Sequence, residues 1–181
     1  MLSPSNIEKL NQISGILNVN PDWLYKLIDF ESGWNPAAIN KKTIAAGLIQ
    51  FIPSTAKSLG FNDSIDLIKK LPKINEQLEY AVKPYLIKYR PFISLQSLYM
   101  AVFYPAARFW EPSKKFPAIV TKYNPGIYTP ADYVDNVEKK KTIKKIAAGS
   151  GGLIIFGSIL LLLYFRKGKV QREKRHSPPK D

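Results

Sequence analysis

The chain has 181 residues, of which 45% are hydrophobic, and a net charge of +13, so it can form one modest domain with appendages. It has no cysteine, and its one histidine, His176, lies in a polar tail. This inventory excludes a disulfide framework, a thiolate zinc site and a catalytic triad that uses histidine. We expect no bound metal and no cofactor.

The charge is distributed unevenly along the chain. Residues 1–138 carry 15 Lys and Arg against 12 Asp and Glu, whereas residues 139–181 carry 12 against 2. The basic character therefore belongs to the C-terminal part and not to the first 138 residues.

The first 19 residues predict a helix, because apolar residues recur at helical spacing after a cap at Ser5 or Asn6. They have no basic leading region and no unbroken apolar run, so we do not expect a secretory signal.

A second helix is predicted after Asn20, a good N-cap, with Pro21 at the first helical position. Its apolar face is followed, in the same register, by Glu31 at the end of the helix. Burial disfavours a charged carboxylate, so we expect a raised pKa for Glu31 and the ability to donate a proton. The alternative is a helix-end residue that faces water.

The next stretch, residues 32–50, is rich in loop formers, and residues 43–51 predict a short hairpin. Trp34 either lines a cleft or packs against the helix before it. Further helices are expected over 53–59, 74–83 and 94–104, the second of them interrupted by Pro84. Another is expected to begin after a cap at residues 62–64 and to end at residue 71. Prolines make 105–130 irregular, and a last helix begins at Thr129 or Asp132.

Residues 146–165 contain no charged side chain. A helix of this length spans about 30 Å, the thickness of a bilayer core. A buried core helix is the alternative, but lysines flank the segment, so we predict a single transmembrane helix. Residues 139–145 form a basic linker and residues 166–181 a basic disordered tail. Basic residues on both sides suit anionic lipid head groups and give no orientation. No base-reading motif for nucleic acid is present.

Two motifs carry a resemblance to a known family: Glu31-Ser32-x-x-Asn35-Pro36-x-Ala38, and the run from Gly47-Leu48-Ile49-Gln50-Phe51 to Leu59-Gly60. They resemble the catalytic core of the soluble lytic transglycosylases, lysozyme-like enzymes of peptidoglycan. The resemblance implies that Glu31 is the catalytic acid and base, and that Ser32 and Gln50 belong to the substrate site, with Gln50 bonding an N-acetyl group. Ile49 replaces the family's Met, a volume-conserving change.

Three later stretches are also similar to the family. Residues 74–80 resemble a Gln-Leu segment of phage members. Tyr133-Val134-Asp135-Asn136-Val137 resembles a late Tyr-Val-x-x-Val element, which implies that Tyr133 lies near Glu31. Val102-Phe103-Tyr104-Pro105-Ala106 departs from the family's Ala-Tyr-Asn-Ala-Gly: Phe103 replaces Tyr and Tyr104 replaces Asn. Both are candidates for the sugar cleft, which keeps its aromatic character there but loses an amide.

The resemblance implies a mostly α, lysozyme-like α+β domain over residues 1–138 with a small β-hairpin, and the uncharged segment adds one C-terminal transmembrane helix. It implies cleavage of the MurNAc–GlcNAc β-1,4 bond with formation of 1,6-anhydro-MurNAc. Most glycosidases need two carboxylates, and Asp29, Asp63 and Asp66 are not obvious partners for Glu31. A lysozyme-type hydrolase and a non-catalytic glycan-binding or structural membrane protein remain alternatives. A hole-forming protein is disfavoured by the extended soluble domain.

For the location, we expect a phage virion-associated enzyme, anchored in a membrane and used to penetrate the cell wall during entry. A bacterial inner membrane, with the catalytic domain in the periplasm, is the alternative. The expected partners are peptidoglycan glycan strands, anionic lipids and other virion proteins.

Overall fold

The computed structural model describes residues 2–146. Apart from Ile146, the predicted transmembrane helix 146–165 and the basic tail 166–181 lie outside this range. Over residues 2–146, none of the helices has the length and apolar character needed to cross a bilayer.

The first two helices both begin at a proline that follows a capping side chain. Helix α1 spans Pro4–Leu17, and the Ser3 hydroxyl accepts the N–H of Asn6 at 3.2 Å, so the cap is Ser3 and not Ser5 or Asn6 as predicted. Helix α2 spans Pro21–Ser32 with Asn20 as its cap, which confirms the prediction. It ends at Gly33, which has a φ of 63°, a conformation that glycine adopts at low cost.

The predicted hairpin is wrong in detail. Among the described residues this region has only isolated antiparallel bridges, between Ile39 and Ala46 and between Ala46 and Phe51. Ile44 and Gln50 have positive φ values of 58° and 51°. Positive φ turns the backbone sharply, so this segment folds as consecutive tight turns and not as two extended strands.

Short helices follow: α3 (Pro53–Ser58), α4 (Ser64–Lys70) and α5 (Ile74–Gln77), which continues as the π-helical turn η1 (Leu78–Val82) and as α6 (Lys83–Ile87). The prediction that Pro84 interrupts the helix is therefore wrong. Pro84 has no N–H to donate to the carbonyl four residues earlier. The π turn accommodates it, because the Lys83 N–H bonds to Leu78, five residues back.

The C-terminal half contains α7 (Leu95–Phe103), the 3-10 turn η2 (Pro105–Ala107), α8 (Ala118–Tyr123) and α9 (Pro130–Ile146). Thr129 caps α9: its hydroxyl accepts the Asp132 N–H, and the Asp132 carboxylate accepts the Thr129 N–H in return. The helix continues through residues 139–145, the predicted basic linker.

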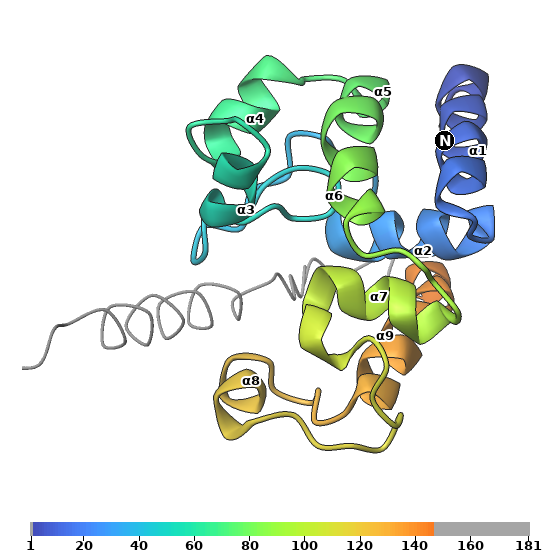
Figure 1. Ribbon diagram of the computed structural model, residues 1–181, viewed down its shortest axis with the longest axis vertical. Coiled ribbons are helices and arrows are strands. Elements are labelled where there is room, and N and C mark those ends of the chain that lie inside the picture. The colour runs from blue at the N-terminus through green and yellow to red at the C-terminus, as the bar shows by residue number, and fades with distance from the viewer. Residues whose placement is uncertain (1, 147–181) are drawn as a thin grey trace, which may run out of the picture.

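Helix α2 lies at the centre of this arrangement and contacts α1, α7 and α9, as Figure 1 shows. Leu24, Leu27 and Ile28 are completely buried, and so is most of α7. The apolar face of α2 thus packs between α1 and the α7–α9 pair. Glu31, one turn beyond Ile28 on the same face, is carried into the interior.

Candidate active site

The centre of the candidate site is the carboxylate of Glu31, at the last turn of α2. Only 6% of the Glu31 surface is exposed, so the predicted register with the apolar face is confirmed and the water-facing alternative is excluded. The Tyr133 hydroxyl, 102 residues later on α9, donates to Oε1 of Glu31 at 2.5 Å. A hydrogen bond this short to a carboxylate oxygen belongs to the strong, charge-assisted class.

The Tyr133 side chain is held by three aromatic neighbours on two helices, α2 and α7. Its ring stacks on Phe103 of α7, with centroids 4.4 Å apart, and meets Phe30 of α2 and Tyr99 of α7 edge-on at 5.5 and 6.5 Å. Tyr133 is completely buried. Such packing fixes the ring orientation, and with it the direction in which the hydroxyl points.

The electrostatic environment keeps Tyr133 protonated. Burial raises its pKa well above the usual 10.0, and the negative charge of Glu31 and the hydrogen bond to Glu31 raise it further. Tyr133 is therefore a permanent donor at any pH where an enzyme works. A donor favours the charged carboxylate, whereas burial favours the neutral acid, so the two influences on Glu31 act in opposite directions.

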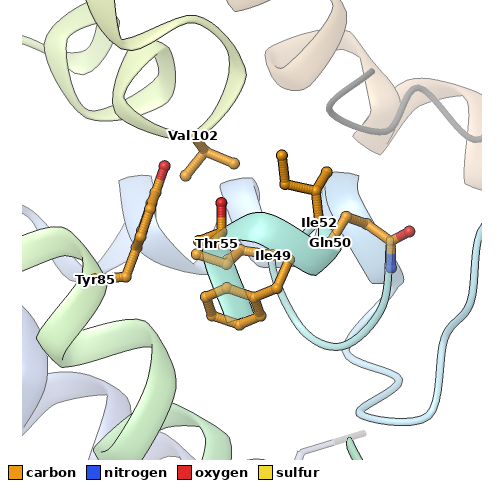
Figure 2. A pocket seen from close by; sticks show the side chains of 7 residues that line it. Ile49, Gln50, Ile52, Thr55, Tyr85 and Val102 are labelled. Atoms are coloured by element: carbon orange, nitrogen blue, oxygen red, sulfur yellow. The ribbon is translucent and has the colours of Figure 1, made fainter. Parts of the chain in front are cut away.

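A pocket includes Val102 of α7, the residue before Phe103, whose ring stacks on Tyr133. It is lined by Ile49, Gln50, Phe51, Ile52, Thr55, Tyr85 and Val102 (Figure 2). Thr55 of α3 and Tyr85 of α6 direct their hydroxyls toward Val102 of α7. Burial, then Tyr89, and then the charge of Glu31 raise the pKa of Tyr85 well above 10.0.

Sequence reasoning missed Tyr85. Its hydroxyl donates to the Ala101 carbonyl at 2.8 Å, so the side chain links α6 to α7 beside the pocket. Buried pairs recur every four residues before it, at residues 77–78 and 81–82. A period of four suits the wider π turn, so the turn at Leu78–Val82 keeps Tyr85 on the buried face. Recognising that period would have identified it.

Of the predicted residues in the first two motifs, Gln50 lines the pocket, and Ser32 is the last residue of α2. The Ser32 hydroxyl is half-buried and donates to the Ile28 carbonyl at 3.2 Å. Gln50 is 2% exposed, and its amide nitrogen donates to the Gly47 carbonyl at 3.0 Å, while the side chain extends away from Tyr85 in Figure 2. Trp34 follows the packing alternative, because its buried ring lies against Tyr25 of α2 at 5.2 Å.

The two aromatic candidates in α7 lie in the core. Phe103 is 3% exposed and is sandwiched between Tyr133 and Phe116. Tyr104 is 9% exposed and meets Phe116 and Trp110 edge-on. The geometry gives Phe103 a role in holding Tyr133, and sugar contact by either side chain stays a prediction.

A second residue that sequence reasoning missed, Gln77, joins the loops that follow α2. Its amide nitrogen donates to the carbonyls of Pro36 and Leu71 at 2.8 and 2.9 Å, and its oxygen accepts the Leu48 N–H at 2.9 Å. The side chain is completely buried. A Cβ on Gly47 would lie 2.7 Å from the Gln77 oxygen, so the close approach requires glycine there. The signal in the sequence is a glutamine on the apolar face of a helix.

Several other carboxylates of the described chain have structural roles of their own. Asp63 and Asp66 accept backbone N–H groups at the start of α4, and Asp66 also pairs with Lys70. Glu79 pairs with Lys9 and Lys83, and Glu138 with Lys26.

A mostly helical domain that buries one glutamate at the end of its central helix is of the lysozyme-like class. The family model for the transglycosylase SLT domain matches residues 9–146, and the chain belongs to this family. No curated protein and no solved structure matched the chain. Membership of the family supports lytic transglycosylase activity on peptidoglycan.

Proposed function

We propose that the protein cleaves the β-1,4 bond between MurNAc and GlcNAc, with Glu31 as both general acid and general base. The observation that carries this proposal is the Glu31 carboxylate, buried at the end of α2 and fixed by the Tyr133 hydroxyl at 2.5 Å. A general acid must be held in place near the bond that it protonates, and this geometry meets that need.

In the proposed reaction, Glu31 gives its proton to the glycosidic oxygen, and the C1–O bond of MurNAc breaks. The resulting carboxylate then takes the proton of the MurNAc C6 hydroxyl, whose oxygen bonds to C1 and closes the 1,6-anhydro ring. No water is consumed, and Glu31 ends the cycle protonated. Because a single carboxylate serves both proton transfers, the second carboxylate of most glycosidases is not needed.

Tyr133 orients the carboxylate through both steps and does not itself lose a proton, because its pKa is raised far above neutrality. We propose Gln50 and Ser32 as the substrate-side residues next to Glu31. Gln50 lines the pocket, and Ser32 follows Glu31 directly on α2. Phe103 and Tyr104 remain candidates, and the buried positions of both favour a supporting role.

The test is a digest of purified peptidoglycan with the full chain, analysed by mass spectrometry beside Glu31→Gln and Asp29→Asn. Asp29 is the matched control, since it lies on the same helix about 200° away around the axis. Anhydro-muramyl products from the parent and from Asp29→Asn, and none from Glu31→Gln, are expected. Reducing-end products would indicate a hydrolase, and intact peptidoglycan with a folded parent would indicate a binding or structural protein.

We further propose that residues 146–165 anchor the enzyme in a membrane, with a phage virion membrane as the first location to test and wall penetration at entry as the role. The support is the uncharged 20-residue segment between two basic clusters. The full chain should stay in membranes after alkaline carbonate extraction. A variant with lysine at Leu160, Leu161 and Leu162 should be released. Immunodetection in purified virions tests the location.

A further inference from the structure

A second cross-link joins α2 and α9 a short distance from the Glu31–Tyr133 pair. The Lys26 ammonium of α2 donates to Oε2 of Glu138 on α9 at 2.7 Å. Lys26 is five residues before Glu31, and Glu138 is five residues after Tyr133. The two cross-links are therefore equally spaced on antiparallel helices, about 7.5 Å apart along the axis.

The same carboxylate also contacts the third helix of the site. The Tyr99 hydroxyl of α7 donates to Oε1 of Glu138 at 2.9 Å, so both oxygens of Glu138 are bonded, one to each neighbouring helix. Lys26 is held in turn by Asp22 at 2.7 Å. We call Asp22, Lys26, Tyr99 and Glu138 the α9 clamp. The Tyr99 ring also touches the Tyr133 ring, which couples the clamp to the site through packing.

The Lys26–Glu138 bond is a second point of attachment between α2 and α9. The hydrogen bond of 2.5 Å at Tyr133 attaches α9 to α2 at one point, and the Lys26–Glu138 bond attaches it again about 7.5 Å away, which restricts rotation of α9 on α2 further.

Among the ion pairs of the described residues, Lys26 is the least exposed lysine. The Lys26 side chain is 18% exposed, whereas Lys139 and Asp135 are 69% and 63% exposed. Its hydrogen bonds to Asp22 and Glu138 raise the pKa of Lys26, and burial followed by Glu138 raises the pKa of Tyr99.

We infer that Glu138 is a positioning residue for the reaction: through Lys26 and Tyr99 it sets α9 on α2, so that the Tyr133 hydroxyl keeps the Glu31 carboxylate in its reactive orientation. The inference rests on the proposed function of Glu31. A displacement of a reacting group by about 1 Å can reduce turnover by two orders of magnitude, so loss of the clamp has a measurable consequence.

The kinetic test compares Glu138→Leu, Glu138→Gln and Lys26→Met in the full chain, with soluble glycan strands as substrate. Glu138→Leu and Lys26→Met should lower kcat roughly 10- to 100-fold with KM within about twofold, and Glu138→Gln less, since it keeps an acceptor for Tyr99. The matched control is Lys9→Met, which removes the Lys9–Glu79 pair between α1 and the π turn. Its kcat should equal that of the parent.

Epistasis separates positioning from a general loss of structure. If Glu138 acts through Tyr133, then Glu138→Leu should lower kcat no further in a Tyr133→Phe background. An equal loss of kcat in both backgrounds, or an equal loss in Lys9→Met, would overturn the inference.

A readout without turnover distinguishes this inference from the proposed function. The Tyr133 hydroxyl proton, in its short bond to Glu31, should give a low-field proton resonance that is absent from Tyr133→Phe. Glu138→Leu should shift or broaden that resonance, and Lys9→Met should not. An unchanged resonance in Glu138→Leu would refute the clamp even in an inactive parent. A parent that shows the resonance but forms no product would refute the proposed function alone.

Discussion

Replacing Tyr133 with Phe tests the arrangement at Glu31 with the smallest possible change. The ring keeps its stack on Phe103 and its edge contacts, and only the hydroxyl that donates to Glu31 is removed. A hydrogen bond to a charged group contributes about 1.5–3 kcal/mol. Because Tyr133 is completely buried, solvent does not directly replace the donor.

If the whole of that energy serves to orient the carboxylate, kcat should fall roughly 10- to 150-fold, since 1.4 kcal/mol is a factor of ten. KM should change little, because the hydroxyl is directed at Glu31 and not into the pocket. The assay is the initial rate of anhydro-muropeptide release, measured by mass spectrometry well below the thermal midpoint of the variant.

Tyr128→Phe is the matched control, because that side chain is 56% exposed and lies in the segment just before α9. It should turn over like the parent. A Tyr133→Phe enzyme with the parent's kcat and a native fold would refute the reasoning that the short hydrogen bond positions the catalytic group.

Three further predictions concern the scaffold of the site. Gly47→Ala should destabilise the fold by at least about 1 kcal/mol, since Gly47 has a φ of 82° and a Cβ there meets Gln77. Gly15→Ala, on the open face of α1, should instead stabilise the fold by about 0.5–1 kcal/mol. Urea denaturation measures both changes. Phe103→Leu should lower the thermal midpoint and kcat but leave KM unchanged; a rise in KM alone would instead indicate a sugar contact. Burial keeps Tyr85, Tyr99 and Tyr133 protonated above pH 10 in the folded state, whereas the unfolded chain loses these protons. Stability should therefore be constant up to about pH 10 and then fall by about 4 kcal/mol per pH unit for three side chains; a flat profile in alkaline urea titrations would contradict this assignment.

The elements that the sequence predicted best are those whose signals are local. The start of α2 follows from Asn20 and Pro21, and the burial of Glu31 follows from its register with Leu24, Leu27 and Ile28. Capping and helical periodicity involve residues within a few positions of one another, so they are readable from the chain alone.

The errors arose where local signals compete with tertiary packing. Pro84 normally ends a helix, but here a π turn and burial of the helix face on both sides of it keep the helix continuous. Residues 43–51 are predicted to form a hairpin, whereas positive φ at Ile44 and Gln50 converts the segment into turns. Tertiary contacts stabilise both conformations, and no short-range rule predicts them.

The partners within the site lay beyond sequence reasoning from the residues. The Glu31–Tyr133 bond spans 102 positions, and only the family resemblance indicated that the two lie close together. The α9 clamp was missed, because it depends on which helices meet in space and not on spacing along the chain. Gln77 and Tyr85 have a signal on one helix face, but the groups that they bond cannot be predicted from it.

The most direct test of the central claim is a peptidoglycan digest in water enriched in oxygen-18. If Glu31 catalyses ring closure by the C6 hydroxyl, the muramyl ends formed by the full chain should be 1,6-anhydro and should contain no heavy oxygen. The same ends should be absent from a digest with Glu31→Gln. Muramyl reducing ends that carry one oxygen-18 atom would show that water attacks C1, and would contradict the transglycosylase mechanism.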